Sequence, residues 1–143
     1  MADARHVAAL QSGVDAWNAW RRTNSEIVPD LRGVDLIHAK LNGLNLDDAD
    51  LREANLYGAD LVNAGLRRAN LEQTRLWGVD LTGADLTSAT LKNIAVLNRE
   101  GRRTNFANAI LRGVVFTSEA DDNDLTGFLE LVDCNNESAG AMR

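Results

Sequence analysis

Leucine occupies every fifth position from Leu31 to Leu91, thirteen times in succession. An α-helix turns about 100° per residue, so a step of five spreads these leucines around the whole helix. A flat strand alternates its side chains between two faces, so the same step sends successive leucines to opposite sides. Neither element can bury all of them in one core. The pattern therefore predicts a chain that turns a corner about every five residues around a leucine-lined axis, which is a solenoid of stacked coils.

The positions before each leucine repeat as well. A small apolar residue, usually alanine, stands two residues before the leucine, and Asp or Asn usually stands directly before it. Asp and Asn tolerate turn conformations and hydrogen-bond to nearby backbone, which suits a corner in every unit. Segments 49–53 (ADLRE) and 54–58 (ANLYG) resemble the pentapeptide-repeat family, whose consensus is A(D/N)LXX. The resemblance covers roughly residues 29–118.

This resemblance implies an all-β solenoid, a right-handed quadrilateral β-helix with twenty residues per coil and about four to five coils over residues 29–118. The pattern is interrupted at about residues 98–104, where Gly101 takes the leucine position and Arg99 would face inward. An unpaired arginine cannot enter a narrow apolar core. We therefore expect this segment to bulge outward or form an abnormal face without shifting the register. It is either a solvated turn or a basic contact loop of Arg99, Arg102 and Arg103.

Residues 1–28 are expected to form an N-terminal capping helix and the segment that leads into the coils. Solenoid ends expose strand edges and open core unless they are covered. Over about residues 4–22 the apolar side chains recur at helical spacing, and Pro29 then marks the passage into the first coil. The cap residues are Val7, Leu10, Val14, Trp17 and Trp20. A membrane-binding amphipathic helix is the alternative, although the basic residues in this segment form only a weak basic face.

Residues 119–143 form an acidic tail with a short helix expected at about 124–133. Ile110 and Val115 take the place of Asp or Asn in their units, so they should face outward and require an apolar cover. The tail has four apolar residues at helical spacing: Leu125, Phe128, Leu129 and Val132. This helix could close the end of its own rod or pair with a second chain in a homodimer.

One outer row of the coils is apolar. At intervals of twenty residues, the position after the leucine holds Ile37, Tyr57, Trp77 and Leu97, and glycines follow the two aromatic residues. The patch should therefore be flat and open. Exposed apolar surface with Tyr and Trp usually marks an interface. A ladder that only stabilises neighbouring coils is the alternative, and the two are compatible.

Charge bears on the best-known activity of the family. Its quinolone-resistance members bind DNA gyrase, and the acidic ones are thought to imitate duplex DNA. The chain has a formal net charge of −6. Residues 31–118, however, carry eleven basic and ten acidic side chains, acidic in the early coils and basic in the later ones. This short rod imitates DNA poorly and has no continuously basic face, so no direct nucleic-acid partner is expected.

No catalytic motif, metal-ligand spacing or phosphate-binding loop is present in the sequence. We expect no enzyme activity and no cofactor. The sequence also contains no signal peptide or membrane span, which predicts a cytoplasmic protein. The predicted function is a protein–protein interaction module with an unidentified protein partner. The alternatives are a gyrase regulator that grips its target through the bulge and the apolar row, and a sensor or adaptor part of a larger assembly.

Overall fold

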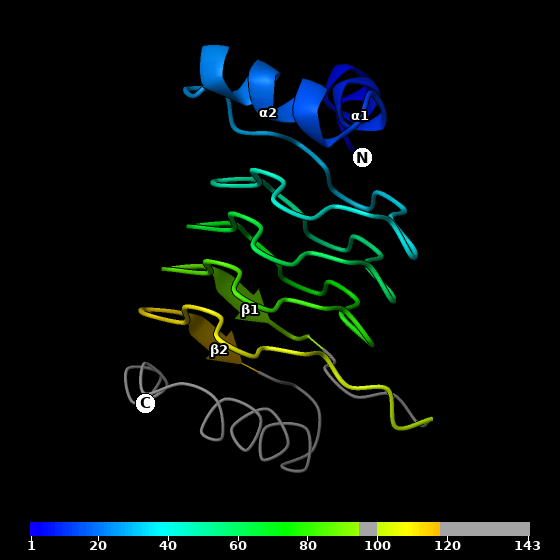
Figure 1. The fold of residues 1–143 in the computed structure, drawn as a ribbon, viewed down its shortest axis with the longest axis vertical. Coiled ribbons are helices and arrows are strands. Elements are labelled where there is room, and N and C mark those ends of the chain that lie inside the picture. Colours follow the sequence, from blue (N-terminus) through cyan, green and yellow to red (C-terminus); the bar gives the residue numbers. More distant parts are fainter. Residues whose placement is uncertain (95–99, 118–143) are drawn as a thin grey trace.

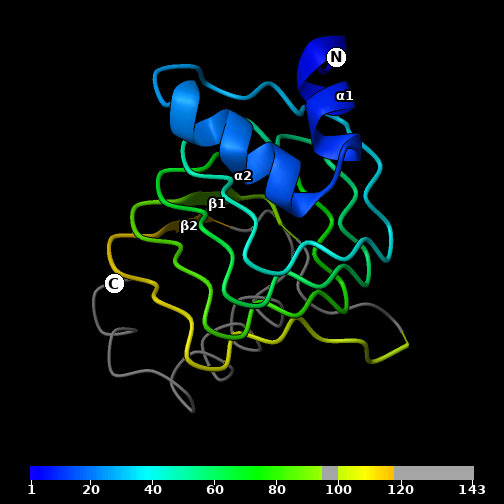
Figure 2. The same cartoon turned by 45° about the horizontal axis from the view of Figure 1, so that its top comes forward.

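The computed structural model describes residues 1–94 and 100–117. Two N-terminal helices, α1 (Ala4–Gln11) and α2 (Val14–Thr23), lead into a stack of similar coils (Figure 1). Figure 2 shows α2 lying across the end of the coils with α1 beside it. The sequence predicted one helix here, and the structure has two. Gly13 separates them because its φ of 103° lies in a region that side-chain-bearing residues rarely adopt.

The coils repeat every twenty residues. Parallel bridges join residues that are twenty apart, from Asp30–Asp50 to Asn70–Thr90. From Leu31 to Leu86 each corner is closed by a backbone hydrogen bond to the leucine carbonyl, as from Val34 N to Leu31 O at 3.2 Å. The residue before the donor has a positive φ, 66° at Gly33, which is the geometry of a type II turn. The predicted corner in every five residues is therefore confirmed.

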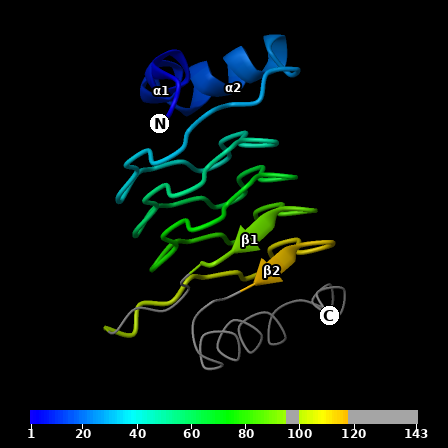
Figure 3. The ribbon, with the colours of Figure 1, turned by 180° about the vertical axis from the view of Figure 1, so that it is seen from behind.

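Within residues 1–94 and 100–117 only two strands are long enough to be assigned, β1 (Thr90–Lys92) and β2 (Val115–Thr117), and they pair in parallel on neighbouring coils (Figure 3). The reason is that turns occupy most of each five-residue unit, so the other coil-to-coil pairs are single bridges. The leucines fill the interior, and nearly all of them are fully buried. The carboxylate or amide before the leucine accepts from the backbone two residues on, as Asp50 Oδ1 does from Arg52 N at 3.2 Å. This confirms the predicted role of Asp and Asn.

Beyond Ile94 the spacing between paired residues changes. Asp80 pairs with Asn105 and Asp85 with Ile110, which are intervals of twenty-five residues. Phe106 and Leu111 are nevertheless buried, so the inward column is retained. The prediction that the register does not shift is thus right for the core and wrong for the stacking of the coils. One whole additional five-residue unit lengthens the coil while leaving the inward positions in step.

Part of the predicted bulge at 98–104 is described. Residues 100–103 are exposed, and the chain from residue 100 extends beyond the outline of the coils above it (Figures 1 and 3). Thr104 has already returned to the wall: it is fully buried and its hydroxyl donates to Leu76 O at 2.7 Å. The outward loop therefore ends one residue earlier than predicted, and residues 98 and 99 lie outside the described ranges.

The helices contact the first coil through its backbone as well as its core. Trp17 is fully buried and its indole donates to Asn45 O at 2.6 Å. Asn18 accepts from Asn45 N at 2.8 Å and donates to Gly43 O at 2.9 Å. Leu10 is buried as well, whereas Val7, Val14 and Trp20 are partly buried against the same core. All five predicted cap residues thus lie against the core.

One part of the first coil remains uncovered by these helices. Among the described residues, the backbone N–H groups of Asp35 and Lys40 donate no hydrogen bond, whereas one coil later Asn55 N and Asp60 N donate to carbonyls at 2.9 Å. Leu36, between these two positions, is only partly buried. The helix pair therefore covers one part of this end and leaves the edge around residues 35–40 open.

Candidate interaction surface

The first three members of the predicted apolar row lie on one face of consecutive coils. Hydrogen bonds from His38 N to Tyr57 O (2.8 Å) and from Gly58 N to Trp77 O (2.9 Å) hold these coils in register. Ile37 is 43% exposed, and Tyr57 and Trp77 are half-buried. They line a shallow hollow of about 320 Å³ together with Asn55, Arg75 and Glu100. We call Ile37, Tyr57 and Trp77 the aromatic row.

The fourth predicted member, Leu97, lies outside the described residues. Because pairing after this coil runs at intervals of twenty-five residues, the counterpart of Trp77 on the next coil is Arg102. A Cβ placed on Gly78 would lie 3.8 Å from Arg102 Cβ, which confirms that the two segments are neighbours. The sequence reasoning missed this place for Arg102 because it counted every coil as twenty residues.

Tyr57 is contacted from both sides. The His38 ring meets it edge-on, with centroids 5.2 Å apart, and the Arg102 guanidinium carbon lies 5.6 Å from its centroid, within the range of a cation–π contact. The His38 ring also occupies the space over Gly58, where any added Cβ would collide with it. The predicted flat and open patch is therefore wrong in shape. Glycine here makes room for a side chain from the neighbouring coil.

The indole N–H of Trp77 is buried and has no acceptor among the described residues. An unsatisfied buried donor costs about 1–3 kcal/mol. Within the described part of the chain, packing rather than hydrogen bonding holds this ring in place. No sequence signal distinguishes this tryptophan from one whose N–H is satisfied.

Charged side chains of both signs lie beside the aromatic row, with Asp35 next to Ile37 and Arg75 and Glu100 in the lining of the hollow. Arg75 is exposed and forms no ion pair with the described residues. Arg102 Nε lies 3.6 Å from Glu100 Oε2, and both side chains are mostly exposed. Arg103 is exposed as well, and Arg99 lies outside the described residues. Of the predicted basic loop, the structure thus brings Arg102 to the aromatic row.

At the other end of the rod, Ile110 and Val115 are 43% and 48% exposed, which confirms that they face outward. The tail residues predicted to cover them, Leu125, Phe128, Leu129 and Val132, lie outside the described ranges.

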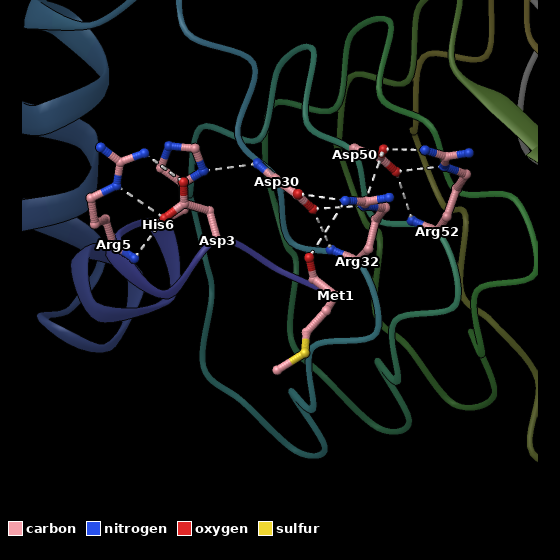
Figure 4. A network of polar contacts seen from close by, with 8 residues as sticks. All are labelled: Met1, Asp3, Arg5, His6, Asp30, Arg32, Asp50 and Arg52. Carbon is pink, nitrogen blue, oxygen red and sulfur yellow. Dashed lines mark hydrogen bonds and ion pairs between the residues drawn. The ribbon is translucent and has the colours of Figure 1, made fainter.

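An ion-pair ladder follows a different face, beside the N-terminal segment (Figure 4). Arg32 binds Asp30 at 2.8 Å, Arg52 binds Asp50 at 2.7 Å, and Arg32 also lies 3.9 Å from Asp50. The hydrogen bonds from Arg32 lower the pKa of Asp30 to about 2, and those from Arg52 lower the pKa of Asp50. The Asp-x-Arg spacing in segments 30–32 and 50–52 could have revealed these pairs from the sequence.

The same view shows how the N-terminus joins this ladder. Asp30 N donates to His6 Nδ1 at 3.0 Å, and Asp3 N donates to Asp30 O at 3.1 Å. Asp3 also pairs with Arg5 at 2.8 Å, and hydrogen bonds from Arg5 hold the pKa of Asp3 well below its usual range. These contacts attach the start of α1 to the first coil.

Two further properties concern the described residues only. No group of three or more His, Cys, Asp or Glu side chains there is arranged to hold a metal ion. No helix in residues 1–94 or 100–117 is both long enough and apolar enough to cross a membrane.

Comparisons with known proteins agree with this geometry. The family described as pentapeptide repeats matches residues 30–67 and 64–95, with 8 copies of the repeat. A pentapeptide repeat protein from the cyanobacterium Cyanothece 51142 is 30% identical, with a TM-score of 0.55 over 60% of this chain. The present chain covers 55% of that protein, or about half its length. None of the curated proteins matches the chain.

A second solved structure, of the pentapeptide repeat protein alr5209 from Nostoc Pcc 7120, covers more of the molecule. It is 25% identical with a TM-score of 0.57, over 80% of this chain and 87% of its own. The five-residue leucine column, the turn at every unit and the twenty-residue coil of this chain agree with these matches to pentapeptide repeat proteins. The chain therefore belongs to the pentapeptide-repeat family, whose fold is a right-handed β-helical solenoid.

Proposed function

We propose that this protein is a non-enzymatic protein-interaction module and that the aromatic row is its binding surface. The observation that carries the proposal is the hollow between Ile37, Tyr57 and Trp77, which leaves apolar side chains accessible on a face that is otherwise polar. Tyr and Trp are the residue types most enriched among those that dominate binding energy at interfaces.

The coils beneath the row favour this use. Each of the three residues is carried by a coil that is hydrogen-bonded to the next, so the row is held in place before a partner arrives. A preorganised surface loses little conformational entropy on binding. The alternative, in which the row only stabilises neighbouring coils, explains part of the row, since Tyr57 is half-buried by its neighbours. It does not account for the hollow that the row lines.

Affinity capture from native lysate tests the proposal. The immobilised proteins are the unmutated chain, Trp77→Ala, and Glu72→Ala as a control at the equivalent position on another face. We expect a protein that the unmutated chain and Glu72→Ala retain and that Trp77→Ala loses. Thermal melts must show that the coils of both variants remain folded. Equal capture by all three proteins would exclude the aromatic row as the binding surface.

Gyrase regulation by imitation of DNA is less well supported by the described surface. Two acidic side chains of the first coils are paired with arginines, Asp48 with Arg68 at 2.6 Å and Asp50 with Arg52 at 2.7 Å. Neutralised carboxylates do not reproduce a row of phosphates. A supercoiling assay with purified gyrase separates the two functions, because the interaction module we propose predicts neither inhibition nor protection from a quinolone. An adaptor in a larger assembly could use the same aromatic row.

A further inference from the structure

We infer that the aromatic row selects an acidic peptide segment, in which a carboxylate lies next to an aliphatic or aromatic side chain. The inference rests on the proposed function, because it names the chemistry of the partner for the same surface. It is carried by three features around the hollow: its apolar lining, the unpaired Arg75 at its rim, and the position of Arg102 against Tyr57.

The hollow sets the size of the bound group. Its volume of about 320 Å³ is at the lower end of the range for ligand sites, about 300–1,000 Å³. Such a site admits one or two side chains of an extended segment. Ile37 on one side and Trp77 on the other supply apolar contacts, so the inserted group must itself be apolar.

Arg75 determines the charge that the partner should carry next to the group inserted in the hollow. It stacks directly below Asn55, which is uncharged, through the parallel bridge between these two residues. On the ladder face, by contrast, each arginine has its own aspartate, as Arg52 has Asp50. Arg75 therefore keeps its charge and its planar set of N–H donors available at the rim. Carboxylates are the side chains that match this donor geometry, with two parallel hydrogen bonds.

Arg102 reinforces this preference. Arg75 and Glu100 line the hollow and Arg102 lies beside it against Tyr57, so both guanidinium groups stand toward its Trp77 end, whereas Asp35 stands beside Ile37 at the other end. The pair of Glu100 and Arg102 is mostly exposed, so the attraction between them is screened by water. A carboxylate at the Trp77 end of the hollow would be attracted to the two guanidinium groups, and a basic group there would be repelled.

Single-stranded nucleic acid also combines negative charge with groups that contact aromatic rings, but the geometry favours a peptide. Bases bind by stacking on ring faces that are accessible. Here the edge of His38 and the guanidinium of Arg102 already contact Tyr57, and Trp77 is half-buried. No uncovered pair of ring faces is presented to successive bases.

The experiment uses a phage-displayed library of random peptides, about a dozen residues long, selected against the full-length protein. Enriched peptides are synthesised with a fluorescein label, and their dissociation constants are measured by anisotropy. We expect the peptides to pair Asp or Glu with Leu, Ile or Phe. Binding should weaken about tenfold with Trp77→Ala and with Arg75→Glu. Arg112→Glu makes the same charge change on a different, exposed face, and it should leave binding within about twofold.

Each outcome distinguishes the two proposals. Peptides that depend on Trp77 but lack acidic residues, or that tolerate Arg75→Glu, would overturn the inference and leave the proposed function standing. If no enriched peptide depends on Trp77, both proposals fail. A fluorescein-labelled oligothymidine is measured in parallel. Should it bind more tightly than every peptide in a Trp77- and Arg75-dependent manner, the surface recognises nucleic acid and the inference is wrong.

Discussion

Neighbouring residues of the repeat unit can have opposite environments, as Leu61 and Val62 do. Leu61 is fully buried on the axis of the coils, whereas Val62 lies half-buried on the outer wall. In Leu61→Asp an unpaired carboxylate would enter the core, which should cost about 3–5 kcal/mol of unfolding free energy. Val62→Asp should cost no more than about 1 kcal/mol. Denaturant unfolding measures both, and equal losses would show that the inward column is assigned wrongly.

Carboxylates in ion pairs make the stability dependent on pH. Hydrogen bonds from arginines lower the pKa of Asp30, Asp48 and Asp50. A carboxyl whose pKa is lower in the folded than in the unfolded state stabilises the fold above its unfolded pKa. This contribution is lost as the pH falls through the folded pKa. For Asp30 the window runs from about pH 4 down to about pH 2.

We therefore expect Asp50→Asn to lower the unfolding free energy at pH 7 by no more than about 1 kcal/mol, because the pair is partly exposed and screened. The difference from the unmutated chain should diminish as the pH falls below about 4. Denaturant unfolding at a series of pH values measures it. Glu53→Gln is the control, since Glu53 is exposed and makes no ion pair with the described residues. A difference that stays constant down to pH 2 would refute the ladder's contribution.

At this scale the sequence predicted the residues that repeat and missed those that do not. The burial of the leucines and the turn role of Asp and Asn could be predicted because the same residue types recur at the same positions in every unit. The unsatisfied N–H of Trp77 and the place of His38 over Gly58 were not. Both depend on which side chains from other coils meet at one point.

The helices α1 and α2 are joined to the coils by charged and polar groups as well as apolar ones. Arg21 is buried, and its guanidinium donates to Ile27 O at 2.7 Å and to Asp47 O at 3.0 Å. Burial lowers the pKa of Arg21, and the nearby Asp48 and Asp47 act in the opposite sense. This side chain therefore ties α2 to the loop before the first coil and to the coil itself.

Removing this tie should destabilise the whole rod. We expect Arg21→Ala to cost about 2 kcal/mol of unfolding free energy, because it leaves buried carbonyl groups without a donor. Arg22→Ala removes an exposed arginine from the next position and should change stability by about 0.5 kcal/mol or less. Thermal and denaturant unfolding would compare the two variants. If both are as stable as the unmutated chain, α2 does not stabilise the first coil.

Among the elements, helix was predicted in the right place but as one piece, and the longer coil was not predicted at all. The break at Gly13 was masked by apolar residues that keep helical spacing across it. The longer coil was hidden for a different reason. An addition of five residues leaves Phe106 and Leu111 in the inward column. The five-residue spacing of apolar residues, from which the repeat was predicted, is therefore the same with or without it.

The two ends of the molecule differ in how they are covered. At the first coil, helices and polar contacts cover part of the end. On the last described coil, Ile110 and Val115 are exposed where other units carry polar residues. We expect this end to form a homodimer, since a twofold contact would bury both residues on each chain and cover two strand edges at once.

Light scattering over a concentration series tests the dimer. Ile110→Asp restores the side chain type that other units carry at this place, so it should convert the dimer to a monomer without unfolding the coil. Phe128→Asp tests in the same way whether the tail takes part in the dimer contact. A mass near 15.6 kDa at every concentration for the unmutated chain would rule the dimer out.

The longer coil between Asp80 and Asn105 has a consequence for how this molecule can vary. Positions that face the core recur every five residues, whereas positions that stack on one outer face recur every twenty. A gain of five residues is therefore silent inside. Where one longer coil takes it up, as here, the later coils also keep their outer columns, since Asn105 still stacks on Asp80 and Ile110 on Asp85. A wall of this kind can gain a projecting segment while its core and its other columns stay unchanged, whereas the gain of a single residue would move every later leucine out of the inward column and disrupt the core.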